Sequence, residues 1–167
     1  MGTVTRFTTR YDHAEDRICL LIELKDSTSS RLWLTRRLLN RLVPETVKVV
    51  DTITHRAVSD DPSMLERAHQ FDQQAAVGAI KAQPPVVAED DARLLVSKIA
   101  IRARRGRLLI DLGVGNEIRQ TLSFNSAELR QWISVLYDCY TRAQWSEDMW
   151  PSWVSLARSE PVPARLN

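Results

Sequence analysis

The sequence predicts an α+β fold made of two β-β-β-α units, with a mostly antiparallel sheet, an extra middle helix and a Trp-rich C-terminal segment. Two patterns support this fold class: several short runs are apolar at alternate positions, and two longer runs are apolar every three or four residues. A third observation is a pseudo-repeat, because the apolar patterns of residues 18–50 recur at residues 108–140. One such unit buries little apolar surface alone, so a pair is expected.

The first β-β-β-α unit is predicted over residues 1–57. Residues 3–11 are rich in Thr, Val and Phe, which favour a strand, and residues 17–24 alternate as a second strand. A polar turn then leads to a short third strand at residues 31–35. Thr35 can cap the helix that follows, in which Pro44 predicts a kink or a break. The apolar stripe of this helix is Leu39, Leu42, Val43, Val47, Val50 and Ile53.

A middle helix and linker are predicted over residues 58–91. Asp61 followed by Pro62 is typical of a helix start, and the helix is expected to continue to about Lys81. The Pro-rich, acidic residues 83–91 are typical of a linker. The expected buried stripe of the helix is weak and consists of Met64 or Leu65, Ala68, Phe71, Ala75 and Ile80.

The second β-β-β-α unit is predicted over residues 92–145. Strands are expected at residues 93–101, 107–112 and 118–124, and Asn125 with Glu128 has the spacing of a capping box. The next helix has the clearest periodicity of the chain, with Leu129, Trp132, Ile133, Leu136, Tyr137 and Tyr140 on one face. The C-terminal segment, residues 146–167, is expected to be partly disordered, with a frayed end after Arg158.

Composition indicates an ordinary globular chain. It has 167 residues, 44% of them hydrophobic, and a formal net charge of +2. Its mean hydropathy is −0.27, and no apolar run reaches the roughly 18 residues of a membrane span. Residues 1–10 lack the apolar core of a signal peptide, so a cytoplasmic location without membrane contact is expected.

The sequence offers little support for catalysis or for a cofactor. It contains no G-x-S-x-G, H-E-x-x-H or phosphate-loop pattern, and Cys19 and Cys139 lack zinc-ligand spacing. His69 shares a predicted helix face with Glu66 and Gln73, but nothing supplies the other half of a metal site. We therefore expect a non-enzyme without metal or cofactor, and a histidine on a solvated face or at an interface.

The predicted function is a non-catalytic binding or assembly module that acts through protein–protein contacts. Trp and Met are enriched at such contacts, and three of the five Trp residues lie in one segment. The predicted edge strands also favour self-association as a homodimer. The expected partner-binding residues are Trp145, Met149, Trp150 and Trp153, with packing of this segment onto its own core as the alternative.

The alternative function is binding of single-stranded DNA or RNA. Arginines on a sheet can meet phosphates while an aromatic ring stacks on bases. Two groups of basic residues suit this role. The alternative is that these arginines pair with acidic residues or line a protein interface. The first group, with its Trp, is Arg31, Trp33, Arg36, Arg37 and Arg41, and the second is Arg102, Arg104, Arg105, Arg107 and Arg119.

Overall fold

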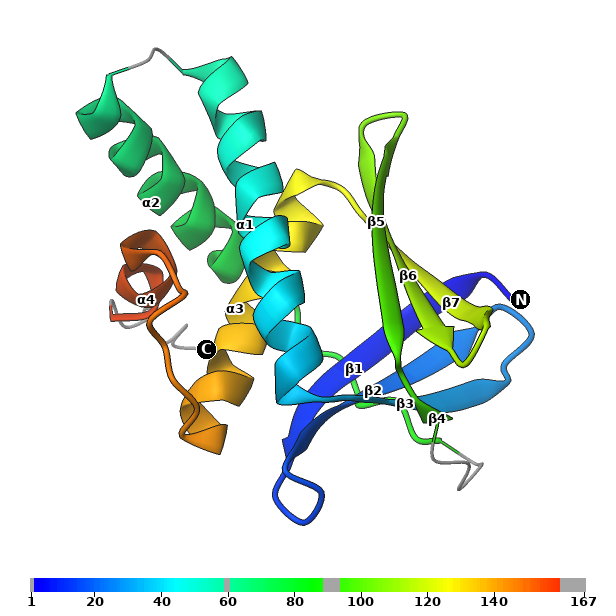
Figure 1. Ribbon diagram of the computed structural model, residues 1–167. Coiled ribbons are helices and arrows are strands. Elements are labelled where there is room, and N and C mark those ends of the chain that lie inside the picture. Colours follow the sequence, from blue (N-terminus) through cyan, green and yellow to red (C-terminus); the bar gives the residue numbers. More distant parts are fainter. Residues whose placement is uncertain (1, 59–60, 89–93, 160–167) are drawn as a thin grey trace, which may run out of the picture.

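The computed structural model describes residues 2–58, 61–88 and 94–159 and confirms the α+β prediction (Figure 1). The order of its elements is consistent with two β-β-β-α units separated by a middle helix. The elements of the first half are β1 (Val4–Asp12), β2 (Arg17–Leu24), β3 (Ser29–Leu34), α1 (Arg36–Ala57) and α2 (Pro62–Gly78). Those of the second half are β4 (Leu94–Leu95), β5 (Lys98–Arg104), β6 (Arg107–Val114), β7 (Glu117–Phe124), α3 (Ser126–Ala143) and α4 (Ser152–Ser159).

The strands form two separate sheets, in the orders β1-β2-β3-β4 and β5-β6-β7. All pairs are antiparallel except β3 with β4, so the expectation of mostly antiparallel pairing is confirmed. The single strand expected at residues 93–101 is wrong, because the chain changes sheets there. The Val96 amide donates to the carbonyl of Trp33 in one sheet, and the Ser97 amide donates to that of Gly113 in the other.

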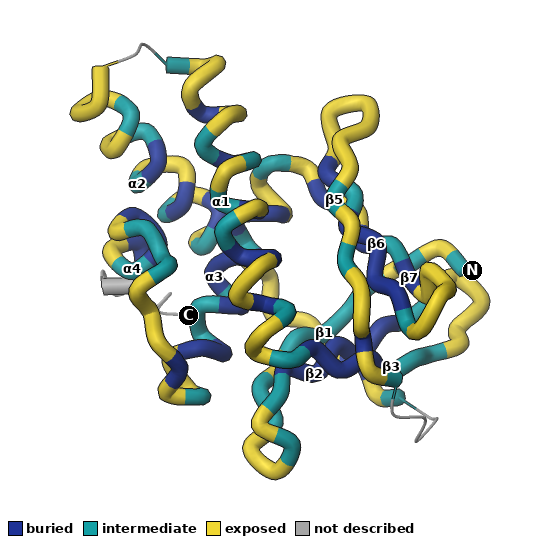
Figure 2. The backbone as a smooth tube through the Cα atoms, in the orientation of Figure 1, coloured by how far each residue is buried: buried dark blue, intermediate teal, exposed yellow. Residues whose placement is uncertain are grey.

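The two halves share one hydrophobic core. In Figure 1 the helices lie on one side of the molecule and the two sheets on the other. Helix α3 of the second half packs against β1 of the first half as well as against β6 and β7, and α1 packs against β5. Figure 2 shows the buried backbone concentrated where these elements meet. Each unit therefore completes its burial with elements of the other.

Three helices begin at the residues that the sequence indicated. The Oγ1 atom of Thr35 accepts a hydrogen bond from the Leu38 amide, and Asp61 caps α2 through the Ser63 amide. Asn125 and Glu128 form the predicted reciprocal capping box, with both bonds at 2.8 Å. The expected effect of Pro44 needs correction in part, because α1 continues unbroken through it.

The face of α2 that is buried differs from the predicted stripe. Phe71 is 71% exposed, and Met64 and Ile80 are exposed as well, whereas His69, Gln73 and Ala76 are buried. The helix ends at Gly78 rather than near Lys81. Helix α2 packs against α3 and α4, and its buried polar side chains meet polar groups there. The prediction of the buried face of α2 from apolar periodicity alone was therefore wrong.

The C-terminal segment packs back onto the core. Trp145 and Trp153 are buried, and residues 152–159 form α4. The expected frayed end after Arg158 falls almost wholly on residues 160–167, outside the described part of the chain. Among the described residues, no helix combines the length and apolar character needed to cross a bilayer.

Candidate functional site

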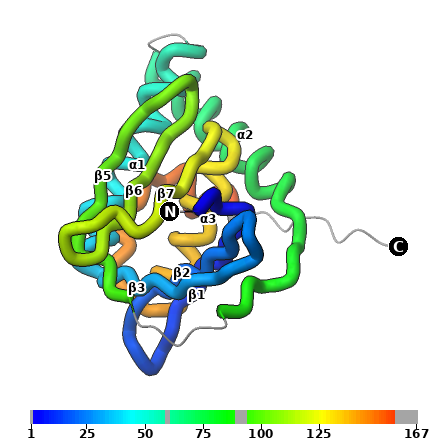
Figure 3. The backbone as a smooth tube through the Cα atoms, turned by 90° about the vertical axis from the view of Figure 1, so that its right-hand side faces the viewer, coloured from blue at the N-terminus to red at the C-terminus, as the bar shows by residue number. Residues whose placement is uncertain are grey.

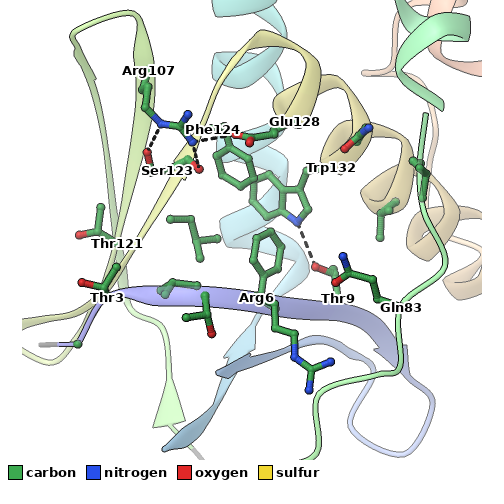
Figure 4. Close-up of a pocket in the computed structure, with 18 residues that line it drawn as sticks. Thr3, Arg6, Thr9, Gln83, Arg107, Thr121, Ser123, Phe124, Glu128 and Trp132 are labelled. Atoms are coloured by element: carbon green, nitrogen blue, oxygen red, sulfur yellow. Dashed lines mark hydrogen bonds and ion pairs between the residues drawn. The ribbon is translucent and has the colours of Figure 1, made fainter. Parts of the chain in front are cut away.

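A groove of about 760 Å³ lies between the two sheets (Figure 4). One wall is β1 and the other is β7, and the first turns of α3 close the space between them. The segment after α2 contributes Ile80 and Gln83 to the rim. The groove thus exists only because the two halves meet.

Three aromatic rings from three elements form the apolar floor of the groove. Phe7 of β1 meets Phe124 of β7 edge-to-face at 5.9 Å between ring centroids, and meets Trp132 of α3 at 6.3 Å. Phe124 and Trp132 stack at 5.1 Å. The Trp132 indole donates a hydrogen bond to Thr9 Oγ1 at 3.1 Å, which fixes the ring. The floor is therefore rigid and apolar.

Charged side chains at the rim are already paired. Arg107 donates from Nε to Ser123 Oγ at 2.7 Å and from Nη2 to Glu128 Oε2 at 2.8 Å. Arg6 is paired with Glu23 and also donates to the carbonyl of Pro84 at 3.0 Å. Figure 4 shows Arg107 and Arg6 at opposite sides of the groove. The rim is polar but close to electrically neutral.

Both walls of the groove are edges of sheets. Strand β1 is the first strand of its sheet and β7 is the last strand of the other. Within the described ranges, neither pairs with another strand on its groove side. Every second residue of an edge strand turns its backbone N–H and C=O away from the partner strand, so unpaired donors and acceptors border the aromatic floor.

A second polar site lies away from the groove, where four helices meet. Arg130 of α3 is 2% exposed, and its Nη2 donates to Thr54 Oγ1 of α1 at 2.9 Å. The Gln73 amide of α2 donates to the Arg130 carbonyl at 2.9 Å. Trp153 of α4 covers the guanidinium at 5.2 Å and stacks on His69 at 5.0 Å. This network joins α1, α2 and α4 to α3, so we assign it a structural role.

The structure does not gather the first group of basic residues into one surface. Arg31 lies on the outer face of the first sheet, and Arg37 and Arg41 are exposed on α1. Arg36 lies 6.0 Å from the ring of Trp145. Trp33 is only 5% exposed, because Val86 packs over it together with Cys19 and Leu21.

The segment that covers Trp33 crosses the outer side of the first sheet. Figure 3 shows residues 79–88 running down from α2 past β1. The Val86 amide donates to Thr8 Oγ1 at 2.9 Å and holds the segment there. A base cannot stack on Trp33 in this structure, which removes the ring from the predicted single-strand platform.

The second group of basic residues divides along the other sheet. Arg102 makes a bidentate pair with buried Asp111, at 2.6 and 2.8 Å. Arg104 and Arg105 lie with it at the β5–β6 turn, and Arg107 reaches over to β7 and α3. Arg119 lies at the opposite end of the sheet, next to the irregular pairing near Gly113. The structure gathers four of the five arginines and separates Arg119 from them.

The expected partner-binding residues of the C-terminal segment contact their own chain. Trp145 packs on Tyr140 and Tyr11, at 5.0 and 5.7 Å between ring centroids. Trp150 packs on Tyr140 at 5.2 Å, and Met149 is half-buried against the core. A partner could reach Trp145 and Trp153 only if the segment left the core, whereas Met149 and Trp150 stay partly exposed.

Sequence reasoning identified the elements of the groove but not the groove. Phe7, Phe124 and Trp132 all stood in predicted elements, yet nothing indicated that they would meet. Arg130 was missed as well. Its position three residues before Ile133, at the border of the apolar stripe, was the one available signal.

No family model matches the chain, and neither the curated proteins nor the solved structures contain a significant match. The described ranges hold no group of three His, Cys, Asp or Glu side chains placed to bind a metal ion.

Proposed function

We propose that the protein is a non-catalytic binding module that receives an extended segment of a partner protein in the groove between β1 and β7. The observation that carries this proposal is the combination of two unpaired strand edges with an aromatic floor between them. Strand addition to a free edge is a common mode of peptide recognition, in which backbone hydrogen bonds supply affinity and side-chain pockets supply specificity.

The lining indicates the chemistry of the segment. Phe124 and Trp132 are only 3% and 4% exposed, so a large aliphatic or aromatic side chain would meet mainly the half-buried side chains of the lining, which are Val4, Phe7 and Val135. Arg107 and Arg6 are already paired with carboxylates, so an uncharged segment fits better than a strongly acidic one. The volume lies within the range of roughly 300–1,000 Å³ that is typical of ligand sites.

A peptide selection on the immobilised full chain tests the proposal. We expect the selected peptides to contain large apolar side chains and to compete with one another for a single site. Val135 lines the groove and is only half-buried, so Val135→Trp fills the space without disturbing the core. This variant should weaken binding of selected peptides at least tenfold in fluorescence anisotropy.

Thr52→Trp is the matched control, because it adds the same ring to an exposed position of α1 that does not line the groove. It should bind the peptides like the unmodified chain. Equal affinities of both variants would contradict the proposal. Sedimentation of the unmodified chain as a dimer that Val135→Trp dissociates would also overturn it, because a second copy would then occupy the groove.

A further inference from the structure

The β5–β6 hairpin carries four arginines at its tip. Arg102, Arg104, Arg105 and Arg107 lie within six consecutive residues, and no aromatic residue lies among them. In Figure 1 the hairpin projects beyond the rest of the sheet, and Figure 2 shows its end as exposed. The arginines are therefore exposed on a projecting two-stranded ribbon.

The backbone of this turn does not favour arginine. Arg105 and Gly106 form a two-residue connection, with φ values of +51° and +74°. Positive φ at both central positions is the geometry of a type I′ turn, in which Asn or Asp followed by Gly is preferred. Gly106 suits its position, but the side chain of Arg105 makes the left-handed conformation unfavourable.

The strand pairing beside the turn is also unfavourable. Arg104 lies directly opposite Arg107 in the antiparallel register. Like charges in this arrangement destabilise a sheet. Neither residue choice at positions 104 and 105 is explained by the folding of the hairpin, and such local conflicts are expected at functional sites.

The four guanidinium groups differ in their partners. Arg102 is held by Asp111, and Arg107 is held by Glu128 and Ser123. The side chains of Arg104 and Arg105 make no ion pair or hydrogen bond with any residue that the structure describes. Two uncompensated positive charges thus stand between two that are fixed in place.

We propose that this tip binds the phosphodiester backbone of double-stranded nucleic acid. Guanidinium groups form bidentate hydrogen bonds with phosphates. A two-stranded ribbon has dimensions that the major groove of a duplex admits. The tip carries no aromatic ring and Trp33 is covered, so base stacking contributes nothing to binding. The higher charge density of a duplex therefore favours it over a single strand. Arg107 also borders the β1–β7 groove, whereas Arg104 and Arg105 do not line it.

The decisive variant is Arg104→Thr/Arg105→Asn. Thr suits an exposed strand position, and Asn tolerates positive φ, so this chain should unfold at an equal or higher denaturant concentration than the unmodified protein. Its affinity for a labelled DNA duplex, measured by anisotropy at low salt, should fall at least tenfold. The slope of log K against log salt should become shallower by about 0.9 for each lost phosphate contact.

Arg37→Gln/Arg41→Gln is the matched control, because it removes two exposed charges from α1. It should retain most of the affinity. An equal loss in both variants would overturn the proposal, as would the absence of duplex binding by the unmodified chain. Stronger binding of the single strand of the same sequence, or displacement of the duplex by a poly-glutamate peptide of equal charge, would also overturn it.

Discussion

The Nη2 atom of Arg130 lies 3.2 Å from the Nδ1 atom of His69, and both side chains are buried. A guanidinium group can only donate, so Nδ1 of His69 must be the acceptor and its proton is on Nε2. That proton points to Asp51, whose Oδ1 lies 3.3 Å from Nε2. The folded protein therefore holds His69 as one neutral tautomer between a cation and a carboxylate.

This arrangement predicts that stability falls in weakly acidic solution. Burial first, and the charge of Arg130 second, lower the pKa of His69 below its ordinary value of 6.5, although Asp51, Glu66 and Asp72 act in the opposite direction. The unfolded chain thus takes up the proton first as the pH falls. The contribution of neutral His69 to the free energy of unfolding is therefore fully present above about pH 6.5. It decreases below that pH until the folded-state pKa is reached.

Denaturant unfolding across this pH range measures the effect. His69→Gln keeps a neutral acceptor and donor, so its free energy of unfolding should vary less between pH 7 and pH 5 than that of the unmodified chain. His13 and His55 remain in both proteins and serve as the internal control. An unchanged pH dependence in the variant would show that His69 is not the titrating group.

Removal of the Arg130 side chain is predicted to be strongly destabilising. Arg130→Ala leaves the buried oxygens of Thr54 and Gln73 without their donor and opens a cavity under Trp153. Each buried polar group left without its partner costs about 1 to 3 kcal/mol, and the cavity adds to that loss. Urea unfolding should show this loss, whereas Arg67→Ala on the exposed face of α2 should change stability by less than about 0.5 kcal/mol.

Trp153 is predicted to be a core residue of α4. Its ring is 3% exposed and packs on both His69 and Arg130. Trp153→Ala should lower the free energy of unfolding by about 3 to 5 kcal/mol, since a large buried ring is lost. Leu156→Ala, at a 45% exposed position of the same helix, should have a much smaller effect. Equal stabilities of the two variants would contradict the docking of α4.

Both cysteines are predicted to be inert in the folded protein. Burial raises the pKa of the Cys19 thiol, and raises that of Cys139 to about 11. A thiol-reactive disulfide reagent at pH 8 should therefore modify neither residue until the chain is unfolded, because the thiolate is the reactive form. Cys139→Ser isolates Cys19 in the same assay. Rapid modification of the native chain would show that these sites open readily.

The sequence alone determined the features that depend on neighbouring residues. The alternation in residues 17–24, the stripe in residues 129–140 and the caps at Thr35, Asp61 and Asn125 each act over one or two turns of chain. Whether a segment forms a strand or a helix can be predicted from a few neighbouring residues, because the spacing of side chains on one face differs between the two backbone geometries. The α+β class and its pattern of β-β-β-α units were predictable for the same reason.

Tertiary structure decided the rest. Helix α2 has weak amphipathicity, so its packing against α3 and α4 selected the face that contains His69 and Gln73 over the face that contains Phe71. The groove needs Phe7 and Trp132, which are far apart in the sequence, and periodicity carries no information about which edges meet. The covering of Trp33 by Val86 likewise depends on where a linker crosses a sheet. Long-range burial fixes such contacts, and it is a property of the whole chain.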